Sequence, residues 1–208
     1  MLWHVPISYS INYLRAITPK DMKKLCLLYL VFALLLGACS TQNSGPSSGT
    51  DSSSVESAKN VLLHQLKTTH SEKEWFVPVK TALEGLTAEQ AMWHDSSGNH
   101  SAGQLAYHLL FWNKRQLAKF NGQPEGAYPQ DNNETFNNFN QAQWTKVVAE
   151  LDSVLTTFEN AIQNADEAKL KEWYPTIANI SAHNAYHTGQ IIFVRKQQNS
   201  WDPEKGVK

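Results

Sequence analysis

Residues 176–198 read TIANISAHNAYHTGQIIFVRKQQ. One face of this segment repeats at the spacing of an α-helix and consists of Ile180, His183, His187, Ile191 and Val194. The pattern predicts a helix that begins near Pro175 or Thr176 and continues to about residue 198. Because His183 and His187 are four residues apart, their side chains lie about 6 Å apart on one face, where both can bind one metal ion.

Three other segments have the same periodicity, at residues 56 to about 88, 102–120 and 141–164. Pro78 lies inside the first of them and predicts a kink or a break just before it. Ser101 is the expected N-cap of the second. No segment alternates with the period of a β-strand, so the sequence predicts an all-α fold, most simply a four-helix bundle.

The connections between these segments constrain the directions of the helices. A turn cluster at residues 95–99 separates the first two helices, so we expect them to be antiparallel neighbours. Residues 121–140 are rich in Asn, Gly and Pro and are long for a connection within a compact domain. This connection predicts a functional rim or lid, and its length allows the second and third helices to run parallel.

A third histidine, His108, lies on the apolar face of the second helix, between Leu105 and Trp112. Three imidazoles without a nearby cysteine suit one divalent ion, Zn²⁺, Ni²⁺ or another borderline ion, and leave a coordination position for water or substrate. A single core histidine is more often a hydrogen-bonded structural residue. The spacing alone leaves a metal site at roughly even odds and does not identify the third ligand.

Composition excludes two classes of function. The 208 residues carry 18 Lys and Arg against 19 Asp and Glu, a net charge of −1, which excludes a nucleic-acid binder that works by bulk electrostatics. The only cysteines are Cys26 and Cys39, so the chain beyond residue 39 has no thiolate nucleophile and no sulfur ligand for a metal. We expect a small-molecule substrate or ligand as the partner, and no nucleic acid.

The N-terminal region has the layout of an export signal. From Met22 the chain reads MKKLCLLYLVFALLLGACS, with two lysines before an apolar run at residues 25–36. The end of this run is similar to the lipobox of bacterial lipoproteins, in which a cysteine, here Cys39, is acylated and becomes the mature N-terminus. The alternative is a plain signal peptide that ends near a cysteine. We expect residues 1–38 to be the signal region with its true start at Met22; a long leading region before the apolar run is the alternative.

Residues 39–55 are expected to form the lipidated N-terminus and a Ser-rich tether, residues 56–200 the folded domain and residues 201–208 a C-terminal tail. Without residues 1–38, 14 basic and 18 acidic residues are left, a net charge of −4. Because no basic patch is available for anionic lipid, acyl chains on Cys39 must provide the anchor. We expect an exported protein that is lipid-anchored to the bacterial cell envelope. The sequence allows a homodimer but does not predict one.

Several of these segments resemble the DinB/YfiT-like superfamily of four-helix metalloproteins. HNAYHTGQIIFVRK (residues 183–196) is similar to the signature of its last helix, and HSAGQLAYHLLFWNKRQLAKFNG (residues 100–122) is similar to its second helix. ALEGLTAEQAMWHDSSGNHS (residues 82–101) resembles the segment that links its first two helices. The similarity covers residues 58–198. It implies an up-down-down-up bundle whose metal ligands are His108, His183 and His187.

Other residues near the expected site have a functional and a structural interpretation. Four are candidates for contacting the ligands or lining a pocket, namely Gln190, Tyr186, Trp112 and His70. Gln190 lies one turn from His187 and is a candidate hydrogen-bond partner of its ring; it equally suits a cap on the polar interior of the bundle. Gly189 is expected to allow close helix packing, and Arg195 is expected to point to solvent.

The resemblance implies a small metal-dependent enzyme. The superfamily includes transferases in which the metal activates a low-molecular-weight thiol such as bacillithiol or mycothiol. Such thiols are cytosolic, whereas this domain is expected outside the cytoplasm, so we prefer a hydrolase-like or an unassigned metal-dependent activity over S-transfer. The sequence identifies no catalytic acid or base. The alternatives are a non-enzymatic metal- or ligand-binding envelope lipoprotein, and a structural bundle with vestigial histidines.

Overall fold

Four long helices form the body of the structure, a computed structural model that describes residues 52–207, with side chains from residue 58 onward. They are α2 (Ser52–His70), α5 (Ala102–Phe120), α6 (Gln141–Asn164) and α7 (Glu167–Gln197). The shorter elements are the helices α3 (Val79–Leu83) and α4 (Ala88–Ala91) and the 3-10 turns η1 (Asn132–Thr135) and η2 (Pro203–Lys205). These described residues contain no strand, which confirms the all-α prediction. The expected signal region, Cys39 and most of the tether lie outside them.

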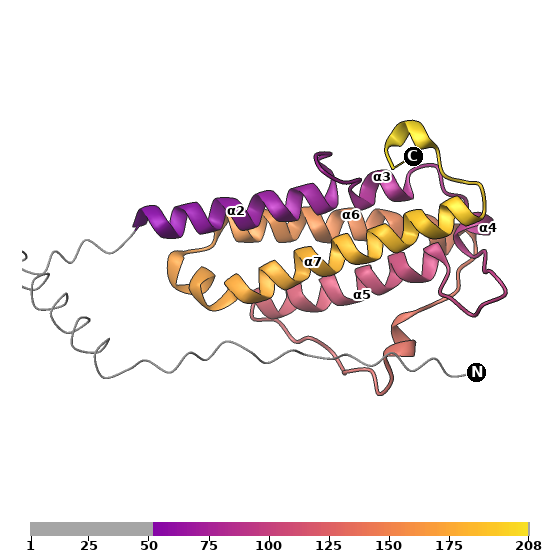
Figure 1. Cartoon of the computed structure of the whole chain (residues 1–208). Coiled ribbons are helices and arrows are strands. Elements are labelled where there is room, and N and C mark those ends of the chain that lie inside the picture. Colours follow the sequence, from indigo (N-terminus) through magenta and orange to yellow (C-terminus); the bar gives the residue numbers. More distant parts are fainter. Residues whose placement is uncertain (1–51, 208) are drawn as a thin grey trace, which may run out of the picture. The chain divides into compact units, whose positions relative to one another are not determined.

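Each long helix packs mainly on two others: α2 contacts α6 and α7, and α5 contacts the same two helices. The pairs α2/α5 and α6/α7 therefore lie on the two diagonals of the bundle. The helices α2 and α7 run in one direction and α5 and α6 in the other, an up-down-down-up bundle as predicted (Figure 1). The prediction that the first two helices are neighbours is wrong. Between them, α3 packs on α7 and α4 packs on α5 and α6, so the chain crosses the bundle.

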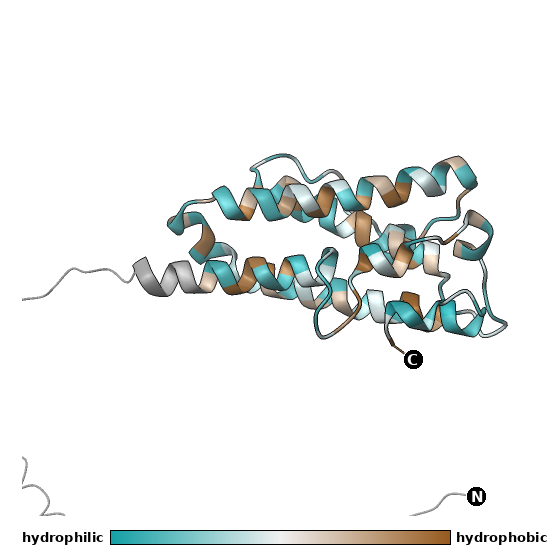
Figure 2. Cartoon of the chain, turned by 90° about the horizontal axis from the view of Figure 1, so that it is seen from above, coloured by the Kyte–Doolittle hydropathy of each residue, from teal (hydrophilic) through white to brown (hydrophobic). Residues whose placement is uncertain are grey.

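The core follows from the helical periodicity of apolar residues. Hydrophobic and hydrophilic residues alternate along each helix, without a long hydrophobic block (Figure 2). On α6 the predicted stripe is buried, with Leu151, Leu155, Phe158 and Ile162 each at most 3% exposed. No helix in the described part of the chain is long and apolar enough to cross a membrane.

Helix α5, which carries His108, begins and ends where the sequence predicts. The Ser101 hydroxyl accepts a hydrogen bond from the backbone N–H of Gln104 (3.1 Å), and the Gln104 side chain accepts one from the Ser101 N–H (3.1 Å). This capping box satisfies two N–H groups that would otherwise lack partners. Asn121 is the C-cap, followed by Gly122 at a φ of 68°. The helix register around His108 is thus set by local sequence.

The first predicted helical segment is shorter than expected. Helix α2 ends at His70, residues 71–78 are irregular, and Pro78 serves as the N-cap of α3. The break predicted before Pro78 is present, but the helix that follows it, α3, ends at Leu83 rather than near residue 88. Proline lacks an N–H and disfavours helical geometry at the residue before it, here Val77.

The last helix is longer than expected. Helix α7 begins at Glu167, where the Asp166 side chain accepts a hydrogen bond from the Lys169 N–H (2.8 Å), and Pro175 lies inside the helix. An interior proline costs about 3 kcal/mol. Burial on both sides of the proline offsets that cost, since Leu170 and Ile177 are at most 1% exposed in one core cluster. The proline therefore did not mark the start of the helix.

Two expectations for the end of α7 are also wrong. Arg195 is 3% exposed rather than solvent-facing. Its guanidinium donates to the carbonyls of Ala82 (2.6 Å), Glu84 (3.2 Å) and Ser200 (2.7 Å). Gly189 is exposed, and a Cβ built on it would meet no atom within 4 Å, so this glycine does not serve helix packing.

Candidate metal centre

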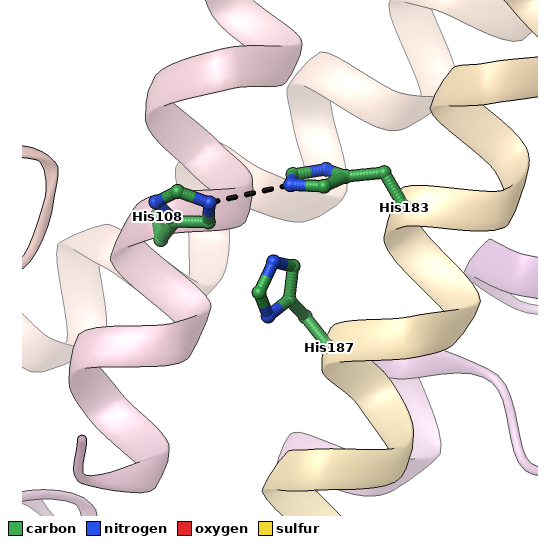
Figure 3. A group of neighbouring side chains, drawn as sticks. All are labelled: His108, His183 and His187. Carbon is green, nitrogen blue, oxygen red and sulfur yellow. Dashed lines mark hydrogen bonds between the residues drawn. The ribbon is translucent and has the colours of Figure 1, made fainter. Parts of the chain in front are cut away.

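Three histidine side chains converge between α5 and α7. His108 comes from α5, and His183 and His187 come from successive turns of α7 (Figure 3). One ring nitrogen of each histidine lies within 4.8 Å of those of the other two. Among the His, Cys, Asp and Glu side chains of the described residues, these three are the ones placed to hold one ion together.

The spacing of the imidazoles fits a metal ion. The Nε2 atoms of His108 and His183 are 3.2 Å apart. Two nitrogens bound at 2.0–2.1 Å to a tetrahedral ion are separated by about 3.3 Å. Two unprotonated nitrogens at this distance repel each other, so in the metal-free protein one of them must carry a proton. In a metal-bound protein the shared divalent ion takes the place of that proton.

The proton position on His108 is set by the loop between α5 and α6. Its Nδ1 lies 2.6 Å from the hydroxyl oxygen of Thr135, and that hydroxyl donates to the Asn132 carbonyl (2.7 Å). Because the hydroxyl proton is already donated to Asn132, the Thr135 oxygen accepts from His108, which therefore carries its proton on Nδ1. The lone pair of Nε2 is left facing the other two histidines, the tautomer that ligation requires. Thr135 is fully buried.

His187 is held in the same tautomer by its own helix. Its Nδ1 donates to the Oε1 atom of Gln190 (2.6 Å), and the amide of Gln190 donates to the Tyr186 hydroxyl (3.3 Å). The amide oxygen is an acceptor only, so Nε2 of His187 is free for a metal. Gln190 and Tyr186, both candidates from the sequence, thus lie in a chain of hydrogen bonds that orients His187.

The environment keeps the imidazoles neutral at physiological pH. Burial lowers the pKa of His108 to about 3, and His187, His183 and His100 add to the shift. Burial also lowers the pKa of His183 to about 4, with a contribution from His187. The pKa of His187 is lowered mainly by burial, against the hydrogen bond to Gln190. Since only neutral imidazole binds a metal, these shifts favour ligation.

A stack of three rings closes one side of the cluster. Phe136 stacks on His108, with ring centroids 4.4 Å apart, and His100 stacks on the other face of Phe136 at 3.6 Å. The sequence did not identify three residues of the site, namely Thr135, Phe136 and His100. The unusual length of the 121–140 connection was the one signal that this loop contributes to the site.

Two hollows flank the cluster along the groove between α5 and α7. One, of about 350 Å³, is bordered by His183 and by Trp112, whose ring meets that of His108 edge-on at 6.3 Å. The other, of about 400 Å³, is bordered by His100 and Gln190. Trp112, a pocket candidate from the sequence, therefore lies at the wall of a cavity. No Asp or Glu lines either hollow.

His70 is not part of this cluster. Its Nδ1 lies 2.7 Å from a carboxylate oxygen of Glu159 and its Nε2 lies 3.0 Å from one of Asp152, both on α6. Burial alone lowers the pKa of His70, but the two carboxylates outweigh burial and raise it. With both nitrogens bonded to carboxylates, His70 is an ion-pair partner that joins α2 to α6 and has no lone pair to offer a metal.

One of the comparisons with known proteins identifies a family. The model of the DinB superfamily matches residues 79–191, which is more than half of the chain and includes all three histidines. Neither the curated proteins nor the solved structures include one that matches the chain.

Proposed function

This chain belongs to the DinB superfamily, and on that basis we propose that it binds one divalent metal ion, Zn²⁺ or Ni²⁺, through His108, His183 and His187. The observation that carries this proposal is the convergence of three ring nitrogens within 4.8 Å. Two of the three rings are also oriented by hydrogen bonds from Nδ1 to Thr135 and Gln190. These hydrogen bonds leave the Nε2 lone pairs of His108 and His187 available to an ion.

We further propose that the protein is a metal-dependent hydrolase that acts on a small molecule. A divalent ion held by three imidazoles keeps an open position and supplies Lewis-acid chemistry to whatever reaches it. The side chains of Thr135 and Gln190 orient the rings of His108 and His187, and Phe136 covers His108. The hollows beside the cluster provide space for a substrate. Transfer of a low-molecular-weight thiol to a substrate is the second function that suits the same site, and the expected export of the domain disfavours it.

The first experiment measures metal content. The full chain is purified in detergent without chelator, and its metal is determined by elemental analysis beside the His183→Ala/His187→Ala double variant. We expect about one equivalent of Zn or Ni in the parent chain and none in the variant. A His64→Ala variant is the matched control, because His64 is an exposed histidine paired with Glu74 (3.2 Å). Parent protein that stays metal-free after reconstitution contradicts the proposal.

A binding role without turnover is the alternative, and one observation favours it. No carboxylate lines the hollows beside the cluster, so no Asp or Glu is placed there to transfer protons. Metal-dependent rates on a panel of ester, amide and thiol-transfer substrates separate the possibilities. A rate on esters or amides that chelator abolishes supports the hydrolase. A rate only with added thiol supports S-transfer, and no rate with a full metal complement supports binding alone.

A further inference from the structure

The last residue of α2, His70, is bonded to α6 through both nitrogens of its ring. Its Nδ1 lies 2.7 Å from Oε1 of Glu159, and its Nε2 lies 3.0 Å from Oδ1 of Asp152. A carboxylate only accepts hydrogen bonds, so both contacts are hydrogen bonds only when each ring nitrogen carries a proton. Because a neutral imidazole has a single N–H, this geometry belongs to the imidazolium form of His70.

The surroundings of His70 stabilise its charge inside the protein. The side chain is 4% exposed, and that of Glu159 is 13% exposed. Burial alone lowers the pKa of His70, but the hydrogen bonds and charges of Glu159 and Asp152 outweigh burial and raise it. The last turn of a helix also favours a cation. Within the described residues His70 has ion pairs with these two carboxylates of α6 and with no group of α7, the other helix packed on α2.

A second cation connects α3 to the same group of charges. The ammonium of Lys80, on α3, lies 2.8 Å from Oδ1 of Asp152, the oxygen that also accepts from His70. The hydrogen bond from Lys80 is the main cause of the lowered pKa of Asp152, and the bond from His70 adds to it against burial. On α2 itself, the nearest ion pair joins Lys67 to Glu72 (3.9 Å) in the following loop. Asp152 therefore links α2, α3 and α6.

His70, Lys80 and Asp152 form one end of a cavity of about 420 Å³ between α3 and α6. Its walls include the buried side chains of Leu83 and Trp144 and none of the three histidines of the candidate metal centre. Helix α3 packs mainly on α7, so the bond from Lys80 to Asp152 spans the cavity. The width of the cavity thus depends on how firmly these charges hold α3 and the end of α2 on α6.

Loss of one proton from His70 breaks one of its two bonds to α6. Glu159 is the more buried carboxylate, whereas Asp152 is also bonded by Lys80. The proton that remains is therefore the one on Nδ1, which faces Glu159. The lone pair left on Nε2 then faces Oδ1 of Asp152 across 3.0 Å, and two acceptors at that distance repel each other.

We propose that His70 is a pH-sensitive latch, whose imidazolium holds the end of α2 and, through Asp152, α3 on α6, and whose deprotonation in mildly alkaline solution releases residues 67–83 and widens the cavity. A free histidine has a pKa of about 6.5, and that of His70 is raised. The stabilisation by the latch is therefore complete below about pH 6.5 and is lost as pH rises through the pKa of the folded protein. The latch contains no metal ligand, so it stands independently of the proposed function.

Hydrogen exchange followed by mass spectrometry tests the latch on the full chain in detergent. Exchange is measured at pH 6 and pH 9 and expressed as protection factors, which remove the intrinsic pH dependence of amide exchange. The segment 67–83 contains hydrogen-bonded amides at Ser71, Glu72 and Ala82. We expect their protection to fall about tenfold or more at pH 9, while the amides of α5 keep theirs.

Variants distinguish a proton-operated latch from ordinary packing. In Asp152→Asn the amide N–H donates to Nε2 of neutral His70 and the amide oxygen accepts from Lys80, so the segment should stay protected at pH 9. His70→Gln carries no charge at either pH and should show equal protection at both. His64→Gln is the matched control, because His64 is an exposed histidine of the same helix that pairs with Glu74 (3.2 Å). This control should keep the pH dependence of the parent chain.

Three outcomes overturn the proposal. They are equal protection of the parent chain at pH 6 and pH 9, a pH dependence in His70→Gln as large as that of the parent, and an undiminished pH dependence in Asp152→Asn. If His70→Gln does not fold, the comparison of Asp152→Asn with the parent decides by itself.

Discussion

At His108 one hydroxyl determines which ring nitrogen carries the proton. Thr135 accepts from Nδ1 at 2.6 Å because its own proton is donated to Asn132. Replacing Thr135 with valine keeps the shape and removes the acceptor, so His108 is free to adopt either tautomer. We predict a 10- to 100-fold loss of metal affinity, the usual cost of removing such a partner.

The measurement is competition with a chelating dye at equilibrium. Thr135→Ser, which retains the hydroxyl, is the matched control and should keep most of the affinity. Equal affinity of the valine variant and the parent would show that the hydrogen bond does not orient the ring in the metal-bound protein.

The lowered pKa values of the same residues predict how acid acts. Ligation needs neutral imidazole, and a free imidazole is protonated below about pH 6.5. Burial lowers the pKa of His183 to about 4 and that of His108 to about 3. We therefore expect metal to be retained through pH 6 and released near pH 4, as followed by metal content after gel filtration at each pH.

The metal-free protein should respond to acid as well. In the unfolded chain these histidines take up protons below about pH 6.5, whereas in the folded chain they do so only near pH 4 and 3. At His108 and His183 the unfolded state binds more protons in this window, so their contribution to the free energy of unfolding falls as pH decreases through it. Urea titrations at pH 7 and pH 5 should show this loss, and a His183→Asn variant should show less of it.

At the scale of elements, a buried arginine joins the end of α7 to α3 and the C-terminal segment. Arg195 is 3% exposed and donates to the carbonyls of Ala82, Glu84 and Ser200. Hydrogen bonds from a charged donor each contribute about 1.5–3 kcal/mol, and carbonyls left unpaired are costly. We predict that Arg195→Met lowers the free energy of unfolding by about 2–4 kcal/mol.

Chemical denaturation of Arg195→Met and of a control variant, each beside the parent chain, measures the change in the free energy of unfolding. Lys196→Met is the control at the next position, where the ammonium bonds the carbonyl of the exposed Val207 (3.3 Å). That change should fall within about 0.5 kcal/mol of the parent, as surface substitutions usually do. Equal effects at both positions would mean that Arg195 does not stabilise this junction.

The 121–140 connection acts as an element in its own right. Arg115 on α5 holds it by donating to the Ala127 carbonyl (2.8 Å), and its guanidinium lies 4.0 Å from the Tyr128 ring centroid. The same loop then delivers Thr135 and Phe136 to His108. Its unusual length is therefore used to cover the candidate metal centre.

At the scale of the whole molecule, we propose that the DinB domain is exported and lipid-anchored through Cys39. The proposal rests on the lipobox-like sequence before Cys39 and the Ser-rich residues after it. Cys39→Ser should abolish both acyl-chain incorporation and recovery in the membrane fraction when the full chain is expressed in a bacterium. The measurement is labelling with a radioactive fatty acid, followed by fractionation.

Cys26→Ser is the matched control, because Cys26 lies within the apolar run and is the only other cysteine of the chain. This variant should be labelled and anchored like the parent. Label that persists in Cys39→Ser, or a parent chain that is never labelled, excludes the lipid anchor and reopens a thiol-transfer role for the site.

The helices that carry the three histidines could be predicted because helical periodicity is a local property. The stripe of α6, the Ser101 cap and the face shared by His183 and His187 depend on residues within a few positions of each other. Local rules failed where burial outweighed them. Local rules predicted a helix boundary at Pro175 and a surface position for Arg195. In the folded protein, contacts with distant segments offset the cost of the interior proline and of the buried guanidinium.

The sequence by itself determined the fold class, the helix directions and the three histidines of the candidate site. His183 and His187 follow from spacing along one helix, and His108 and the helix directions follow from resemblance to a family. Only the tertiary structure decided which nitrogen of each ring faces the centre and which side chains surround it. Thr135 is 27 residues from His108, and His183 is 75 residues from it. Contacts of that range depend on how helices pack and how a loop closes over them, and no pattern within a short window of sequence contains that information.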